Sequence, residues 1–135
     1  MSTEECIFCK IVAGEIPCHK IFEDDKVLAF LDINPVTDGH ALLIPKEHYQ
    51  LMPDVPDDLL AYLFLKTKEL MPKIKTAMQA DYIGLSVVGV DVPHFHIHII
   101  PRKFDDGLAN FWPTKKYAAG EAEEIAQRII KNVKA

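Results

Sequence analysis

The sequence predicts an α+β fold that contains a five-stranded antiparallel sheet, a main central helix, a short N-terminal helix and a C-terminal helix. Five segments have the composition of strands and three have the pattern of helices, without the regular β–α–β alternation of a parallel sheet. The connection 90–93 between the last two predicted strands is short, which favours an antiparallel hairpin. A length of 135 residues suits one domain, so we expect a single domain over residues 1–135.

The first half of the chain is expected to form the short helix and three of the strands. An amphipathic helical pattern ends at Gly14, and a turn at Asp24 and Asp25 separates the first two strands. The third strand follows a loop of turn-forming residues and is closed by Pro45. The helix is expected over residues 5–13, and the strands over residues 20–23, 26–33 and 40–44.

The second half contains the main helix, expected over residues 55 to about 79, where apolar residues recur at helical spacing. Asp54 is the expected N-cap. Pro72 cannot donate a hydrogen bond to the carbonyl of Lys68, so a kink or break is expected there. In the tail, Trp112 is expected to be buried in the core, and the alternative is that it closes over the site of a partner chain. The two remaining strands and the last helix are expected over residues 82–89, 94–101 and 121–134.

Three of the six histidines, His94, His96 and His98, stand at alternate positions within the last predicted strand. Successive side chains of a strand point to opposite faces, at a rise of ~3.3 Å per residue. We therefore expect three imidazoles on one face, with Phe95 and Ile97 in the core on the other. Imidazole acts as nucleophile, base or metal ligand near neutral pH, and a row of them is costly to bury without partners. This row is the expected functional site.

Three alternate histidines permit either a metal site or nucleophilic catalysis by one imidazole. On a regular strand the Cα atoms of His94 and His98 lie ~13 Å apart, so ligation of one ion by all three requires a bulge or splayed side chains. The central His96 suits the role of nucleophile, because a carbonyl that binds the proton of one ring nitrogen leaves the other free to attack. Phosphorus is a suitable target, since phosphoryl transfer depends mainly on positioning and charge stabilisation. His98 would then bind a phosphate oxygen or the leaving group.

The cysteines give a second candidate site. Cys6, Cys9 and Cys18 are an odd number, which argues against a disulfide framework. Cys6 and Cys9 form a CxxC motif, which fits a metal knuckle, a redox pair or chance. Together with His48 and one histidine of the row, this motif would complete a Cys2His2 tetrahedron for zinc.

Composition and charge exclude several classes of function. The chain is 49% hydrophobic and 26% charged, which is typical of a globular protein. A net charge of -5 argues against general nucleic-acid binding, which needs a basic face. No apolar run approaches the ~18 residues of a transmembrane span, and the acidic first five residues are unlike a signal peptide. We therefore expect a cytoplasmic protein without a nucleic-acid or membrane partner.

Four blocks of the chain resemble the histidine triad (HIT) superfamily, in its branch of small nucleoside phosphoramidases that carry a zinc-binding CxxC. The signature of that superfamily, His-x-His-x-His followed by two apolar residues, is present at residues 94–100, with Pro and Arg after it. The other blocks are residues 6–11, 30–35 and 39–48, in the order of the family. The resemblance extends from Cys6 to about residue 102.

The resemblance implies a HIT-like domain that forms a homodimer, in which the two sheets join into one of ten strands. It also implies hydrolysis at the α-phosphate of a purine nucleotide, commonly an adenosine phosphoramidate such as lysine-linked AMP. His96 would be the catalytic nucleophile and form a nucleotidyl-histidine intermediate. His98 and His40 would contact the phosphate and the leaving group.

The resemblance further implies which residues bind substrate and metal. Asp32 would bind the ribose hydroxyls, and the pocket for the base would be walled by Phe8, Phe30 and Ile33. In members that carry the CxxC, zinc is held by residues that match Cys6, Cys9, His48 and His94. This zinc would be structural, with no open coordination position, and His94 would be free of any catalytic role.

One segment departs from the family pattern. Many members have a longer run before the triad, with an Asn and a Gly-Gln-Ser-like stretch that contacts phosphate. Here the run is residues 87–93, it lacks Gln, and Asp91 would repel a phosphate if it pointed inward. Three alternatives therefore stay open. These are a dinucleoside polyphosphate hydrolase, a non-catalytic nucleotide-binding dimer stabilised by zinc, and a hydrolase that uses a metal held by the three histidines.

Overall fold

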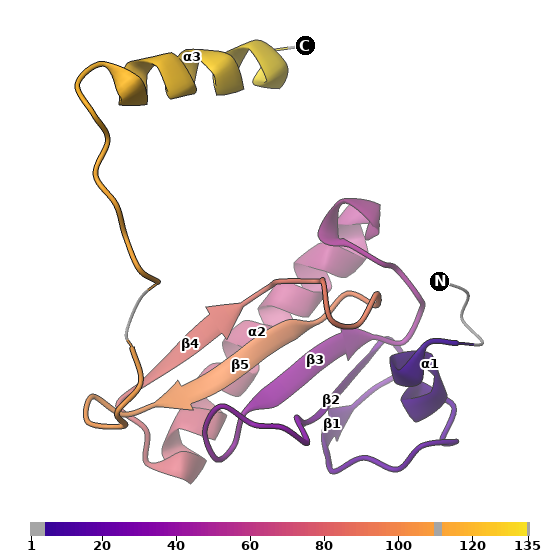
Figure 1. The fold of residues 1–135 in the computed structure, drawn as a ribbon. Helices are drawn as coiled ribbons and strands as arrows, with labels where there is room; N and C mark the ends of the chain where they lie inside the picture. Colours follow the sequence, from indigo (N-terminus) through magenta and orange to yellow (C-terminus); the bar gives the residue numbers. More distant parts are fainter. Residues whose placement is uncertain (1–4, 110–111, 135) are drawn as a thin grey trace.

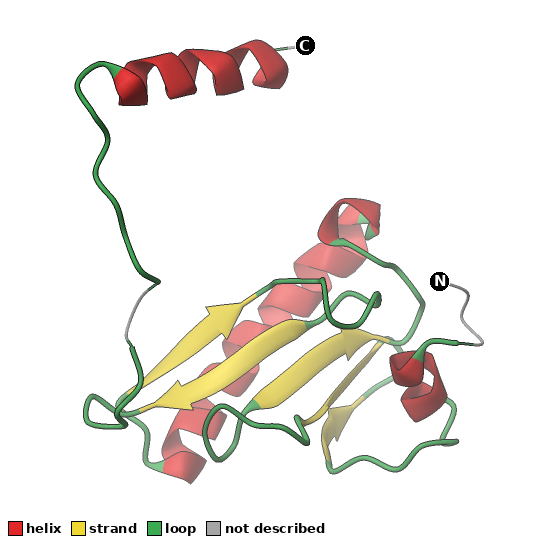
Figure 2. Ribbon diagram, viewed as in Figure 1, coloured by secondary structure: helices red, strands yellow, loops and turns green. Residues whose placement is uncertain are grey.

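The computed structural model describes residues 5–109 and 112–134, which form one sheet, three α-helices and a short 3-10 helix (Figures 1 and 2). In chain order the elements are α1 (Ile7–Val12), β1 (Lys20–Glu23), β2 (Val27–Leu31), β3 (Ala41–Pro45), η1 (Met52–Asp54), α2 (Asp57–Met78), β4 (Tyr82–Ser86), β5 (Ile97–Arg102) and α3 (Glu121–Val133).

The five strands make one sheet in the order β1-β2-β3-β5-β4, and every neighbouring pair is antiparallel. The α+β fold with a five-stranded antiparallel sheet is therefore confirmed, as is the antiparallel pairing of the last two strands. β5 lies between β3 and β4, with His98 opposite Leu42 on one side and Ser86 on the other. The last histidine of the row thus belongs to an interior strand.

The two faces of the sheet are covered at β2 and β3, which explains why these two strands are buried almost throughout. Alternate residues of these strands enter two separate clusters, as the two-residue period of a strand requires. Val27 and Leu43 pack toward the long helix α2, which lies along one face (Figure 1). Leu28 and Leu42 pack on the other face, in a cluster that includes Phe8 of α1.

The strand that was expected over 94–101 begins only at Ile97. Before it, the amide of His94 donates to the carbonyl of Val92, and the amide of Phe95 donates to the carbonyl of Tyr49. These bonds hold the segment in an irregular path next to the sheet. Even so, Phe95 and Ile97 are buried in the cluster beneath α2, as the alternation predicts.

The main helix differs from expectation at its start and at its proline. Asp54 is not the N-cap of α2; it ends η1, where its carboxylate accepts the amide of Leu51, and α2 begins after Pro56. Pro72 does not break α2, which continues to Met78. Both Pro72 and Lys68 are exposed, so the carbonyl that Pro72 leaves without a donor is within reach of water.

The C-terminal part of the chain lies apart from the sheet. In Figure 1, an extended segment from residue 112 leads into α3, and none of the residues of α3 is buried. Trp112 is 79% exposed, so the expectation that it is buried in the core is wrong. Within residues 5–109 and 112–134, none of the helices has the length and apolarity that crossing a bilayer requires.

Candidate active site and metal centre

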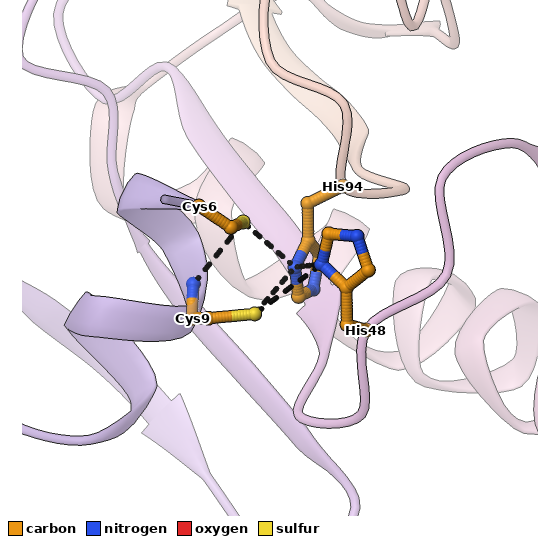
Figure 3. A group of neighbouring side chains, drawn as sticks. All are labelled: Cys6, Cys9, His48 and His94. Atoms are coloured by element: carbon orange, nitrogen blue, oxygen red, sulfur yellow. Dashed lines mark hydrogen bonds between the residues drawn. The ribbon is translucent and has the colours of Figure 1, made fainter. Parts of the chain in front are cut away.

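Four side chains from three distant parts of the chain converge at one end of the sheet (Figure 3). The Nδ1 atom of His94 lies 3.4 Å from Sγ of Cys6, 3.5 Å from Sγ of Cys9 and 3.3 Å from Nδ1 of His48. Sγ of Cys9 lies 3.3 Å from Nδ1 of His48. The four residues with which sequence analysis associated zinc are therefore neighbours.

Local backbone structure brings the two cysteines to the same side. Cys6 is the N-cap of α1, and its Sγ accepts the amide of Cys9 at 3.4 Å. Residues three apart in a helix share a face, so both thiols point toward the loop that carries His48. On the opposite side, Nε2–H of His94 donates to the carbonyl of Pro45 at 2.8 Å. That bond assigns the proton to Nε2 and turns an unprotonated Nδ1 toward the thiols.

The donor set fits a tetrahedral zinc ion. With Zn–S near 2.3 Å and Zn–N near 2.0–2.1 Å, the donor atoms of such a site are separated by ~3.3–3.8 Å, and the distances above match this range. Burial lowers the pKa of His94 to about 4, which keeps its imidazole neutral, as a ligand must be. Burial and the neighbouring thiol of Cys6 raise the pKa of Cys9 to about 11, so a cation is needed to make its thiolate dominant near pH 7.

His96 faces away from this cluster. It is 2% exposed, and its Nδ1–H donates to the carbonyl of His94 at 2.7 Å. In the neutral imidazole Nδ1 therefore carries the proton, and the lone pair lies on Nε2. The ring of Phe8 stands edge-on to the imidazole, with centroids 5.2 Å apart, and restricts its rotation. The three triad histidines thus do not converge on one point, because His94 belongs to the cysteine cluster and His96 does not.

His40 and His98 form a hydrogen-bonded pair beside His96. The amide of Val36 donates to Nδ1 of His40 at 3.0 Å, so the proton of His40 is on Nε2. That Nε2–H donates to Nδ1 of His98 at 2.9 Å, and Nε2–H of His98 has no hydrogen-bond partner among the described residues. Burial lowers the pKa of both imidazoles and favours these neutral forms. Oδ2 of Asp32 lies 3.7 Å from Nε2 of His40. Asp32, His40 and His98 form a second group of possible metal ligands.

A cavity of about 380 Å³ lies against these imidazoles. His96, His98 and Asp32 line its wall, and the other carboxylate oxygen of Asp32 accepts the amide of Asn34 at 2.9 Å. The rest of the wall is mainly apolar. Of the three residues expected there, Phe8 and Phe30 are buried and meet edge to face with centroids 5.5 Å apart, whereas Ile33 is 81% exposed at the rim.

The structure brings almost all predicted site residues to this cavity or to the cysteine cluster. His40 is the exception, because it stands behind His98 and does not line the wall. Sequence reasoning did not assign a role to Asp91, whose Oδ1 lies 3.5 Å from Nε2 of His96. It also did not identify the carbonyl of Pro45 or the amide of Val36, because backbone groups leave no signal in a sequence.

Comparison with known proteins identifies the family of this arrangement. Residues 13–105 match the HIT domain family. A Bacillus subtilis protein named Protein hit is 40% identical over 96% of this chain and 95% of its own length. An adenylylsulfatase of Arabidopsis thaliana is 42% identical over 93% of this chain and 66% of its own length. An adenosine 5'-monophosphoramidase of Schizosaccharomyces pombe is 38% identical over 96% of this chain and 98% of its own length.

Solved structures agree with the sequence relatives. A Streptococcus mutans protein, SMU.412c, superposes with a TM-score of 0.87 at 34% identity, and the match covers 98% of this chain and 87% of that one. A Zn-bound histidine triad family protein of Mycobacterium smegmatis superposes with a TM-score of 0.75 at 28% identity, covering 98% of this chain and 99% of that one. On the matched domain, the shared fold and the identity to these relatives, this chain belongs to the HIT domain family.

Proposed function

We propose that this protein hydrolyses adenosine phosphoramidates, or related nucleotide conjugates, at the α-phosphate through a nucleotidyl-histidine intermediate on His96. One observation carries the proposal. The bond from Nδ1–H of His96 to the carbonyl of His94 leaves Nε2 unprotonated at the wall of a cavity, next to a free N–H donor on His98. A nucleophile beside a proton donor is the arrangement that covalent transfer of a phosphoryl group requires.

The first chemical step forms a bond between Nε2 of His96 and the α-phosphorus and breaks the bond from phosphorus to the leaving nitrogen. The departing amine needs one proton, and Nε2–H of His98 is the donor next to that position. In the second step, water attacks phosphorus, the histidine–phosphorus bond breaks, and the proton of the water returns to His98. The products are one amine and one AMP, and both imidazoles regain their initial form.

The cavity supports a nucleoside as the bound group. Phe8 and Phe30 offer apolar and aromatic surface to a flat base, and a carboxylate such as Asp32 accepts hydrogen bonds from ribose hydroxyls. The name of the S. pombe relative, an adenosine 5'-monophosphoramidase, favours adenosine.

We also propose that zinc is a structural cofactor held by Cys6, Cys9, His48 and His94, a group of four whose donor atoms all lie within 4.8 Å of one another. The ion would supply a cross-link between α1 and the segment before β5, without an open position for catalysis. Among known proteins, the Zn-bound relative of M. smegmatis supports this proposal.

We further propose a single HIT-like domain that works as a cytoplasmic homodimer without nucleic acid or membrane partners. β4 lies at the edge of the sheet, and Leu85, Val87 and Val88 on and after it are exposed. A second copy that pairs with this edge would complete a ten-stranded sheet and cover these side chains.

Hydrolysis of lysine-linked AMP by the wild type, by His96→Ala and by His19→Ala tests the proposal, with the zinc content of each protein measured. His19 is exposed on the surface and serves as the matched control. We expect turnover by the wild type and by His19→Ala, none by His96→Ala, and equal zinc in all three. Denaturation of the wild type at alkaline pH during turnover, where a histidine–phosphorus bond is stable, should reveal protein with one added nucleotidyl group.

Two results contradict the proposal. If the wild type and His96→Ala both bind AMP and neither hydrolyses the conjugate, the protein is a nucleotide-binding module. If His96→Ala retains full turnover, another group is the nucleophile. If turnover occurs only with diadenosine polyphosphates, the reaction class is retained and the substrate is the alternative one.

A further inference from the structure

We propose that Asp91 selects substrates by the charge of the leaving group, favouring amines that carry a positive charge and disfavouring anionic groups. This inference rests on the proposed function, because it concerns the group that departs from the α-phosphorus. It identifies a substrate class, namely conjugates of AMP with cationic amines, for which the triad alone gives no preference.

The position of Asp91 carries the inference. Its Oδ1 lies 3.5 Å from Nε2 of His96, which is longer than a hydrogen bond, and its side chain lines the same cavity. A reacting phosphorus must approach that nitrogen to about 3–3.5 Å. The carboxylate therefore lies within a few ångströms of any group attached to the phosphorus. The side chain of Asp91 is 63% exposed, so its carboxylate is not locked in place by packing and can adjust to a group attached to the phosphorus.

The remaining wall does not compensate this charge. Among the described residues that line the cavity there are two carboxylates, Asp32 and Asp91, and neither a lysine nor an arginine. Sites that transfer nucleotides to or from polyphosphates place cations around the phosphates, because each anionic oxygen needs a charged or hydrogen-bonding partner. A phosphate or sulfate that leaves here would meet a negative charge, whereas an ammonium group would be attracted.

Asp91 is ionised at neutral pH. Partial burial raises the pKa of Asp91, but backbone amides of Val92 and Asp91 and the fields of His96 and His98 outweigh that effect and leave the pKa below its ordinary value. The comparison with relatives leaves the choice of leaving group open. One relative is named an adenosine 5'-monophosphoramidase and another an adenylylsulfatase, at 38% and 42% identity to this chain.

A matched series of substrates isolates charge from other chemistry. AMP is joined through the same type of P–N bond to 1,3-diaminopropane, to propylamine and to β-alanine, which differ in carrying a distal positive charge, none or a negative one. The value of kcat/KM is measured for the wild type, for Asp91→Asn and for Asp105→Asn. Asp105 is exposed in the loop after β5 and is outside the cavity wall, so its variant has the same change in net charge.

We expect kcat/KM of the wild type to be roughly tenfold higher for the diaminopropane conjugate than for the β-alanine conjugate. Two opposite charges a few ångströms apart near a surface attract each other, after screening by salt, with a free energy that corresponds to about this ratio. In Asp91→Asn the ratio should fall close to one, while Asp105→Asn keeps the ratio of the wild type. The inference is overturned if the ratio of kcat/KM between the two charged conjugates is the same in Asp91→Asn as in the wild type. It is also overturned if the wild type prefers the β-alanine conjugate.

The same series separates this inference from the proposed function. If the wild type hydrolyses the neutral conjugate and Asp91→Asn shows an unchanged charge ratio, only the inference fails. If the wild type hydrolyses none of the conjugates, the proposed function fails. Dissociation constants of the three conjugates, measured with His96→Ala and with His96→Ala/Asp91→Asn, then test charge selection alone, and equal ratios in both proteins overturn it.

Discussion

Cys6 and His94 are 88 positions apart in the sequence, yet Sγ of one and Nδ1 of the other are 3.4 Å apart. The contact joins α1 to the segment that leads into β5. Phe8 follows Cys6 on the same helix and packs edge-on against His96. The cluster of Cys6, Cys9, His48 and His94 therefore also helps to position one wall of the cavity and the proposed nucleophile, although none of these four residues lines the cavity.

Removal of the metal should destabilise the protein, because binding to four ligands that the fold brings together contributes directly to folding free energy. We expect about one zinc per chain in the wild type. In Cys9→Ser we expect no retained zinc and a melting temperature lower by roughly 10 °C, which corresponds to about 2–3 kcal/mol for a domain of this size. Metal analysis and calorimetry check this.

The control for this prediction is Cys18→Ser, because Cys18 is a free cysteine outside the cluster. That variant should retain zinc and nearly the same melting temperature. If chelation removes all zinc from the wild type and leaves its melting temperature unchanged, the structural role of the metal is wrong.

The elements of the sheet could be predicted because their residues repeat at the spacing of the structure they form. Leu28 and Leu42 alternate with Val27 and Leu43, and that alternation places them on opposite faces in the structure as in the sequence. The exact start of β5 could not be predicted. It depends on the bond between the amide of Phe95 and the carbonyl of Tyr49, which is a tertiary contact.

The candidate site could be predicted to the level of side chains, but not to the level of protons. The resemblance to histidine triad proteins named the triad and the four residues that the structure brings together as a possible zinc site. The tautomer of each histidine depends on the carbonyl that its ring contacts: the carbonyl of Pro45 for His94, and the carbonyl of His94 for His96. Because every residue has a carbonyl, the sequence does not indicate which one a ring will contact. The approach of Asp91 to His96 depends on the path of a loop, so sequence reasoning noted only the charge.

His98→Ala should slow hydrolysis according to how much the leaving group needs a proton. In the proposed reaction Nε2–H of His98 protonates the leaving nitrogen, so we expect a loss of roughly 10²–10³ in kcat for lysine-linked AMP. The p-nitrophenyl ester of AMP releases a stable anion, so its hydrolysis should fall by less than about tenfold, since no proton transfer is required. Steady-state rates with both substrates decide the question, and equal losses would mean that His98 only positions the phosphate.

The stability of the protein should decrease as the pH falls below about 6.5, the ordinary pKa of histidine. Burial lowers the pKa of His98 in the folded state; the charges of His96 and His40 lower it further, and Asp91 and Asp32 oppose this shift. Between the lowered pKa and 6.5 the unfolded chain binds more protons than the folded one, so the free energy of unfolding rises with pH through this window.

Removing His98 should make that dependence weaker. Thermal unfolding of the wild type and of His98→Asn at pH 5.5 and pH 7.5 gives the slope for each protein. We expect the wild type to lose more stability on acidification than the variant does, whatever the stability of the variant at pH 7.5. Equal slopes would show that His98 does not have a lowered pKa in the folded state.

Gly39→Ala should be strongly destabilising, because Gly39 combines a left-handed backbone with close contacts. Its φ is +91°, and a Cβ there would lie 2.7 Å from Cγ of Met78 and 3.2 Å from Cγ of Pro101. Strain of this kind in the backbone costs about 1–3 kcal/mol before any movement of α2 or β5 is added. Since Gly39 directly precedes His40, a shift here would also disturb the bond to His98 and lower turnover.

Gly14→Ala separates these two effects. Gly14 has φ of +81°, but nothing lies within 4 Å of a Cβ at that position, so its variant carries the backbone strain without the clash. Chemical denaturation of both variants should show a larger loss of stability for Gly39→Ala. Only Gly39→Ala should also lose turnover, because only its clash displaces His40. If the two variants lose equal stability, α2 and β5 accommodate the methyl group, and Gly39 is required for its backbone conformation alone.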